Sequence, residues 1–438
     1  MSLKEKIANF IDEIKNDDGY LPYLYNDRGG EFDRSKDWVY YSGPVWSDDE
    51  PIAAIQTFLT GKWLVSGRTV SRFEHEFSKK NHIGHSLMVN SGSSANLVMI
   101  AALKKHFSWQ DNDEIIVSPV GFPTTIAPLI QNNLVPRFID IEMKSLNFDL
   151  DLLEKEINQR TKGIFISPVL GNPPDMDCLK SIAEKHKIKL ILDGCDSLGT
   201  KWEGENLSDF SVASSCSFYP AHHITTGEGG MVSSNDESLI TLARSLAWWG
   251  RDCYCVGTAN LNPKGTCGKR FCKWLKTHDD IIDHKYYFTN VGYNLKPLDM
   301  QGAIGLEQLK KIDEIHALRR KNKDRIGNML LSSLGEMVTI PGELEKAETS
   351  WFGVPIICNN RTTKQALVKH FEENRIQTRN YFSGNILQHD GYSDLDDYKK
   401  YPLSNQVLER VFFIGCHPCY TEGTFGYIEE VVKNFELK

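Results

Sequence analysis

Two adjacent histidines, His222 and His223, follow a short apolar segment in the stretch SCSFYPAHHITTGEGGMVSS, residues 215–234. The stretch predicts a buried strand, a polar turn and then a glycine-containing hinge into a second strand. An imidazole titrates near neutral pH, so it can remove a proton and return it within one reaction. The pair is therefore a candidate for acid–base chemistry. The alternative is that His222 is a hydrogen-bonded core residue and that His223 orients the strand.

A second group of chemically competent residues is formed by cysteines. Cys195 lies in DGCDS, Cys253 and Cys255 form a Cys-x-Cys pair in GRDCYCVG, and Cys267 follows in KGTCGKRF. Four thiolates complete the two iron tetrahedra of a 2Fe–2S cluster. Zinc also takes four cysteines, and unligated thiols are the third interpretation. Cys272 is a nearby substitute for Cys267.

A possible phosphate site lies in NSGSSAN, between a predicted strand and a predicted helix. Gly92, Ser93 and Ser94 offer backbone N–H groups and hydroxyls at a helix N-terminus, which attracts anions. Ser217 precedes the histidines by a few residues and is within reach of the same phosphate. An ordinary helix cap explains the serines equally well.

Two further residues suit an aromatic cofactor. Asp193 ends the strand of LILDGCDSLG, where a carboxylate can pair with a protonated pyridine nitrogen and strengthen the ring as an electron sink. Phe122 in SPVGFPTT is a candidate to stack on the ring face. A structural ion pair or cap for Asp193, and a core position for Phe122, remain open.

The elements that must position these residues follow an alternating pattern. Apolar strands alternate with helices, which predicts an α/β fold with a mostly parallel sheet covered on both faces. Ligands bind at the carboxyl ends of such strands, where these motifs lie. The predicted strands are 86–90, 114–119, 136–141, 162–170 and 188–195, and the predicted helices are 93–107 and 124–131.

The chain divides into three predicted parts. Residues 1–50 form an amphipathic helix and an arm, residues 51–297 form the large α/β domain with the cysteine loop, and residues 298–438 form a smaller α+β domain. The last part begins with a long helical pattern over 299–334 and continues with strand, helix and strand.

Charge and composition exclude some partners. The chain has 438 residues and a formal net charge of −8, so it lacks the basic excess expected of a nucleic-acid-binding protein. It has no apolar run long enough for a membrane span and no secretory signal pattern. Ten cysteines without such a signal predict a reducing, cytoplasmic setting.

Taken in order, NSGSSAN, VGFPTT, ILDGCDSLG, SFYPAHHITTGEGG and VGYNLKPLDMQGAIG resemble the sugar-nucleotide branch of the aspartate-aminotransferase superfamily, fold type I. The resemblance covers about residues 50–435. It implies pyridoxal or pyridoxamine phosphate (PLP or PMP) as the cofactor, with Asp193 at the pyridine nitrogen. It also implies a homodimer, in which the partner chain's Asn294 reaches the phosphate.

The stretch departs from the family at one position, because His222 stands where a lysine would bind the cofactor as a Schiff base. A histidine cannot tether PLP, so the resemblance implies PMP held without a covalent bond. His222 would then be the general base that removes a proton and protonates a leaving hydroxyl. The implied reaction is 3-dehydration of a nucleotide-linked 4-keto-6-deoxyhexose, in dideoxysugar synthesis for surface polysaccharides such as the lipopolysaccharide O-antigen.

Two kinds of relative share this histidine, one with an iron–sulfur cluster and one without. The cysteine pattern resembles that of the CDP-4-keto-6-deoxyglucose 3-dehydrases, which carry a 2Fe–2S cluster fed by an NAD(P)H-dependent flavin reductase. The longer spacing between Cys255 and Cys267 departs from that pattern. Arg379 or Asn385, in TRNYFSGN, would recognise the substrate.

Three alternatives stay open. The first is the cluster-free, glutamate-recharged dehydratase of the GDP-4-keto-6-deoxymannose type. The second is an ordinary sugar aminotransferase, which the missing lysine opposes. The third is an inactive sensor of the same fold, which the presence of Asp193 and of the spaced cysteines opposes.

Overall fold

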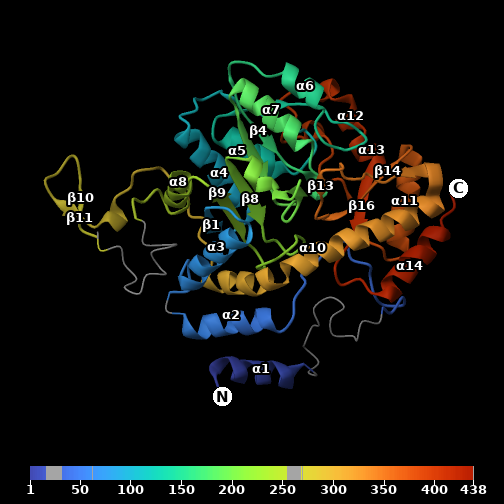
Figure 1. The fold of residues 1–438 in the computed structure, drawn as a ribbon, viewed down its shortest axis with the longest axis horizontal. Helices are drawn as coiled ribbons and strands as arrows, with labels where there is room; N and C mark the ends of the chain where they lie inside the picture. The colour runs from blue at the N-terminus through green and yellow to red at the C-terminus, as the bar shows by residue number, and fades with distance from the viewer. Residues whose placement is uncertain (16–31, 62, 254–267, 269, 438) are drawn as a thin grey trace.

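A computed structural model describes residues 1–15, 32–61, 63–253, 268 and 270–437. Its large sheet has seven strands in the order β1-β9-β8-β5-β4-β2-β3 (Figure 1). The prediction of a mostly parallel sheet is confirmed, since within this sheet only β9 runs antiparallel to its neighbours. The strands are β1 (His85–Val89), β2 (Glu114–Val117), β3 (Val135–Phe138), β4 (Thr161–Ile166), β5 (Lys189–Asp193), β8 (Ala213–Ser217) and β9 (Gly230–Ser234).

The antiparallel strand has a simple origin. The segment 218–229 connects β8 to β9 without a crossover helix, and a short connection joins neighbouring strands in antiparallel fashion. This connection carries both histidines. The glycine-hinge pattern of the sequence therefore predicted the strand that follows, and the structure shows its direction.

Helices cover both faces of this sheet, as predicted (Figure 1). Successive strand residues point to opposite faces, so Ile115 and Val117 enter one core while Ile116 enters another. The covering helices are α3 (Arg68–Lys80), α4 (Gly92–His106), α5 (Pro123–Gln131), α6 (Leu150–Lys155), α7 (Met176–His186) and α8 (Glu237–Ala247). A small sheet of β6 (Lys201–Trp202), β7 (Glu205–Asn206) and β13 (Ala347–Glu348) lies beside them.

One long helix, α10 (Asp299–Leu334), links the two larger sheets (Figure 1). It has the predicted limits and ends at Gly335, whose φ of 52° suits a glycine after a helix. It contacts α2 (Asp49–Thr60) and α3 as well as α14 (Glu422–Lys433). Because α10 touches both parts, the division at residue 297 stays a prediction.

The second sheet is antiparallel, in the order β12-β14-β16-β15. Its strand–helix–strand pattern agrees with the prediction. Its elements are β12 (Val338–Thr339), β14 (Gly353–Cys358), α11 (Arg361–Glu373), β15 (Thr378–Asn380), α12 (Pro402–Asn405), α13 (Val407–Arg410) and β16 (Val411–Gly415).

Two further segments lie outside the main layers. Helix α1 (Leu3–Ile14) begins with a capping box between Ser2 and Glu5 and packs Ile7 and Ile11 against α2. The hairpin of β10 (Lys273–Trp274) and β11 (Ile281–Ile282) projects from the body near α8 (Figure 1). Among the described residues, no helix combines the length and the apolar character that a membrane span requires.

Candidate active site

A cavity of about 950 Å³ lies at the carboxyl ends of β5 and β8, where a parallel sheet is expected to bind ligands. The second sheet contributes to its wall through Arg379 and Phe413, and Phe352, which directly precedes β14, also lines it. Most of the predicted cofactor residues meet here. The predicted residues that line it are Gly92, Ser93, Phe122, Asp193, Cys195, Ser217, His222 and Arg379.

The residues predicted to cradle a phosphate lie at the start of α4, and not all of them face the cavity. Ser91 caps the helix by accepting a hydrogen bond from the Ser94 N–H at 3.0 Å, so this N–H is already used. Ser94 does not line the cavity, whereas Ser91, which the sequence argument missed, does. A Cβ on Gly92 would lie 2.4 Å from the Cβ of Ser217, which explains why glycine stands here.

The Asp193 carboxylate is held at the cavity by four donors. Its Oδ2 accepts from the Asn96 amide at 2.8 Å and from the Thr125 hydroxyl at 2.7 Å. Its Oδ1 accepts from the Cys195 N–H at 3.3 Å and the Ser215 hydroxyl at 3.4 Å. Asn96 and Thr125 lie inside two of the quoted motifs, but their spacing alone did not indicate this role.

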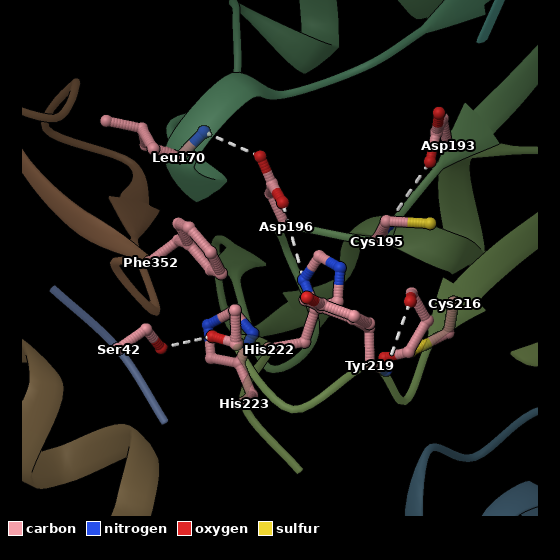
Figure 2. Close-up of polar contacts among 12 residues, drawn as sticks. Ser42, Leu170, Asp193, Cys195, Asp196, Cys216, Tyr219, His222, His223 and Phe352 are labelled. Atoms are coloured by element: carbon pink, nitrogen blue, oxygen red, sulfur yellow. Dashed lines mark hydrogen bonds and ion pairs between the residues drawn. The ribbon is translucent and has the colours of Figure 1, made fainter. Parts of the chain in front are cut away.

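His222 lines the cavity, and its side chain is 15% exposed. Its Nδ1 lies 3.5 Å from Oδ1 of Asp196, and its ring is 5.3 Å from that of Phe352 (Figure 2). Burial, with a contribution from the charge of Arg319, lowers the pKa of His222 to about 3. The expectation of a near-neutral pKa was therefore wrong for this structure, and the imidazole is neutral at physiological pH.

His223 lies outside the cavity lining and is 1% exposed. Its Nε2 donates a hydrogen bond to the Ser350 carbonyl oxygen at 2.7 Å. Burial lowers the pKa of His223 well below its usual value. The structure therefore agrees with the interpretation of His223 as a residue that orients the chain.

Asp196 is the acidic residue that sequence reasoning missed. It lines the cavity, and burial together with the neighbouring charge of Asp193 raises the pKa of Asp196 to about 7. Its Oδ2 accepts a hydrogen bond from the Leu170 N–H at 3.2 Å. The signal was present in DGCDS, because Asp196 follows Cys195 directly.

The four predicted metal ligands are only partly described. Cys195 lines the cavity, and burial next to Asp193 raises the pKa of its thiol well above the usual value. Cys253 follows a bridge between Arg251 and Phe288, whereas Cys255 and Cys267 lie outside the described residues. Within the described part of the chain, no three potential metal ligands gather at one point.

The predicted substrate and partner-chain residues differ in position. Arg379 reaches the cavity with its guanidinium 4.2 Å from the Tyr41 ring. Asn385 is fully buried and donates to the Asn405 side chain at 2.7 Å, so its amide is not presented to the cavity. Asn294 is exposed, accepts a hydrogen bond from Lys296 and does not line the cavity of its own chain.

The fold and this cavity define a class of protein. Residues 46–434 match the DegT/DnrJ/EryC1/StrS aminotransferase family, and the chain belongs to that family. A solved structure of E. coli GDP-4-keto-6-deoxy-D-mannose-3-dehydratase with bound hydrated PLP superposes with a TM-score of 0.78 and 29% identity. The superposition covers 91% of this chain and 99% of the dehydratase chain. This similarity confirms the predicted fold type I architecture.

Two relatives are similar over nearly the whole chain. A dTDP-4-dehydro-2,6-dideoxy-D-glucose 3-dehydratase of Saccharopolyspora spinosa is 37% identical over 91% of this chain and 86% of its own. The lipopolysaccharide biosynthesis protein RfbH of Salmonella typhimurium is 36% identical over 90% of both chains.

Proposed function

We propose that this protein is a PMP-dependent 3-dehydratase of a nucleotide-linked 4-keto-6-deoxyhexose in deoxysugar biosynthesis. One observation carries the proposal. No lysine is among the described residues that line the cavity, and His222 faces it beside Asp193 and the helix cradle. A family of aminotransferases needs a lysine to tether and recharge its cofactor, so this cavity suits a reaction that proceeds without one. The 3-dehydratase relatives support the same class.

The residues present fit PMP. Gly92, Ser93 and Ser217 surround a helix N-terminus that suits a phosphate, and Phe122 is 52% exposed at the cavity, so its face is open to stacking. Asp193 would hold the protonated pyridine nitrogen. When bound, PMP supplies an amine that condenses with a ketone and a ring that accepts an electron pair.

His222 performs the proton transfers in this proposal. Because its imidazole is neutral, it can accept a proton without first losing one. The imidazolium formed in this way then donates the same proton to the hydroxyl that leaves carbon 3 of the sugar. Burial makes the imidazolium a stronger acid, which favours the second transfer and disfavours the first to the same extent.

The class is tested with purified protein, PMP and a nucleotide-linked 4-keto-6-deoxyhexose. We expect the carbon 3 hydroxyl to be replaced by hydrogen, detected by mass spectrometry as a ketosugar lighter by one oxygen atom, with PMP oxidised to PLP and ammonia released when no other electron donor is present. Borohydride treatment in the presence of PLP should leave no pyridoxyl group on a lysine. A reduced pyridoxyl-lysine in a peptide of the cavity would contradict the proposal.

The substrate is proposed more narrowly as a CDP-linked sugar. The cysteine pattern, similar to that of the CDP-sugar dehydrases, supports this choice, and Arg379 offers a guanidinium suited to a diphosphate. The relatives named for dTDP- and GDP-linked sugars are the alternatives. Competition among CDP-, dTDP- and GDP-linked ketosugars at equal concentration would rank them by kcat/KM.

We further propose that Cys195, Cys253, Cys255 and Cys267 bind a 2Fe–2S cluster, reduced by an NAD(P)H-dependent flavin reductase. Support comes from Cys195, which lies at the cavity two residues after Asp193. A cluster there would pass electrons singly to the dehydrated adduct, giving a 3-deoxy sugar.

Iron and sulfide analysis of anaerobically purified protein tests the cluster. We expect about two of each per chain, by the composition of a 2Fe–2S centre, and loss of both in Cys253→Ser. Cys178→Ser is the matched control, because Cys178 lies on α7 and not at the cavity. Iron-free, catalytically competent protein that is recharged by glutamate would favour the cluster-free alternative.

A homodimer is proposed as the active form, with Asn294 of one chain at the phosphate of the other. Its exposed position in the single chain is compatible with such a role. Mixing Asn294→Ala chains with His222→Asn chains tests it. One site of the mixed dimer would carry both defects and the other neither, so partial activity should reappear on mixing.

A further inference from the structure

The Asp196 carboxylate lies between a backbone donor and the imidazole of His222 (Figure 2). Its Oδ2 accepts from the Leu170 N–H at 3.2 Å, and its Oδ1 lies 3.5 Å from Nδ1 of His222. Both side chains are shielded from solvent, with 14% of Asp196 and 15% of His222 exposed. One oxygen is therefore anchored, and the other is directed at a single ring nitrogen.

Leu170, whose N–H anchors Asp196, has a strained backbone conformation. Leu170 has φ 56° and ψ 16°, a left-handed conformation that is strained for a non-glycine residue. Gly171 follows with φ 92°, and a Cβ there would lie 2.8 Å from the Asp196 backbone oxygen. Strained residues persist where the surroundings demand them, and here the strained residue supplies the N–H that fixes Asp196.

The buried ring nitrogen needs a partner. Among the described residues, Nδ1 of His222 is buried and makes no well-aligned hydrogen bond. Oδ1 of Asp196 lies 3.5 Å from this nitrogen and is an acceptor within reach of it. Catalytic hydrogen bonds are often long in a protein without its ligand and shorten when the ligand binds.

We propose that Asp196 is a positioning residue that holds His222 with its proton on Nδ1, so that the Nε2 lone pair faces the cavity. The inference deepens the proposed function, on which it rests, by assigning the atom of His222 that exchanges protons. A carboxylate that accepts from Nδ1–H fixes both the tautomer and the ring orientation, as in the acid–histidine pairs of hydrolases.

The tautomer can be measured without any reaction. Full-length protein labelled with ¹⁵N-histidine, free of cofactor and substrate at pH 8, is examined by two-bond ¹H–¹⁵N correlation. The His222 signals are those that vanish in His222→Asn. We expect Nδ1 protonated and Nε2 unprotonated. His223 is the internal control, because its Nε2 must carry the proton donated to the Ser350 carbonyl.

Two variants of Asp196 then test whether this residue determines the tautomer of His222. In Asp196→Ala we expect the His222 proton to move from Nδ1 toward Nε2, while the His223 signals stay unchanged. Asp196→Asn has one carbonyl oxygen for two donors, Leu170 N–H and His222 Nδ1–H, so an intermediate distribution is expected. In the cofactor-loaded enzyme, turnover of both variants should fall at least about tenfold with little change in KM, the size seen when an orienting partner is lost.

Each outcome counts for or against the proposal. A wild-type His222 protonated on Nε2, or an Asp196→Ala variant with the wild-type tautomer, would overturn it. So would an Asp196→Ala variant that raises KM at unchanged kcat, since Asp196 would then bind ligand directly. A correct tautomer in a protein that dehydrates no ketosugar would refute the proposed function alone.

Discussion

Histidine serves different purposes in the cavity wall and in the buried layer behind it, which includes His223, Arg319 and His417. His222 lines the cavity next to the carboxylate of Asp196 (Figure 2). The adjacent His223 donates a hydrogen bond to a backbone carbonyl. Burial lowers the pKa of both rings. The difference between them is therefore one of partners and access, and not of charge state.

A buried arginine, Arg319, helps to keep both histidines neutral. Arg319 on α10 is fully buried and donates through Nη1 to the carbonyl oxygens of Trp351 and Phe352, at 3.3 and 3.0 Å. Its positive charge contributes to the lowered pKa of both histidines. The layer behind the cavity thus keeps His222 in the form that accepts a proton, while it also fixes the segment that contacts the two rings.

The largest effect is expected on the cavity side. His222→Asn removes the proposed base, and general acid–base catalysis contributes about 10²–10⁴-fold, so turnover should fall by that factor. The melting temperature should change much less than turnover, because the single contact of Nδ1 with Asp196 Oδ1 is long, at 3.5 Å. Steady-state kinetics and calorimetry on the same preparation measure both. Retained turnover would end the assignment of His222.

A smaller effect is expected at the cradle. In Gly92→Ala the new Cβ would lie 2.4 Å from the Cβ of Ser217, and such overpacking costs about 1–3 kcal/mol. We expect PMP affinity to fall by about 5- to 150-fold in a spectroscopic titration. Gly391→Ala is the matched control, since a Cβ there meets no atom within 4 Å. Equal PMP affinity in the two variants would argue against the cradle.

A substitution in the buried layer should lower the free energy of unfolding and have little effect on turnover. His223→Phe keeps a ring but leaves the Ser350 carbonyl without its donor, which should cost about 1–3 kcal/mol in the free energy of unfolding. Turnover should change by less than a factor of about ten, below the range expected for loss of a general base. Urea unfolding and kinetics are compared with those of His222→Asn. A loss of turnover as large as that of His222→Asn would erase the distinction between the two histidines.

This distinction also marks what the sequence could predict. The alternation of apolar strands and helices was enough for the sheet and for the limits of α10, since these depend on local pattern. Asp193 and the cradle could be placed because they follow strands directly. The motif DGCDS marked the position of Asp196, but its contacts with Leu170 and His222 could not be predicted, because both residues are distant in sequence. Likewise, Asn385 is close in sequence to the cavity-lining residues Ser383 and Ile386, but its amide donates a hydrogen bond to Asn405 and does not face the cavity.

The smallest effect at neutral pH concerns His417 of the same buried layer. Its Nε2 donates to the Gly43 carbonyl oxygen at 3.0 Å, and its Nδ1 accepts from the Cys419 N–H at 3.1 Å, so both nitrogens are used in the neutral form. Burial, with the charge of Arg319, lowers the pKa of His417 to about 4. The unfolded chain therefore binds this proton near pH 6.5, whereas the folded chain resists it.

Stability should consequently fall as the pH drops from about 6.5 toward 4. Linkage gives a loss of about 2 kcal/mol from His417 between pH 7.5 and pH 5. His417→Gln lacks this titration, so its unfolding free energy should depend less on pH by that amount. His75→Gln, on the exposed side of α3, is the control for the loss of a histidine. Parallel slopes for wild type and His417→Gln would mean that the layer does not hold this histidine neutral.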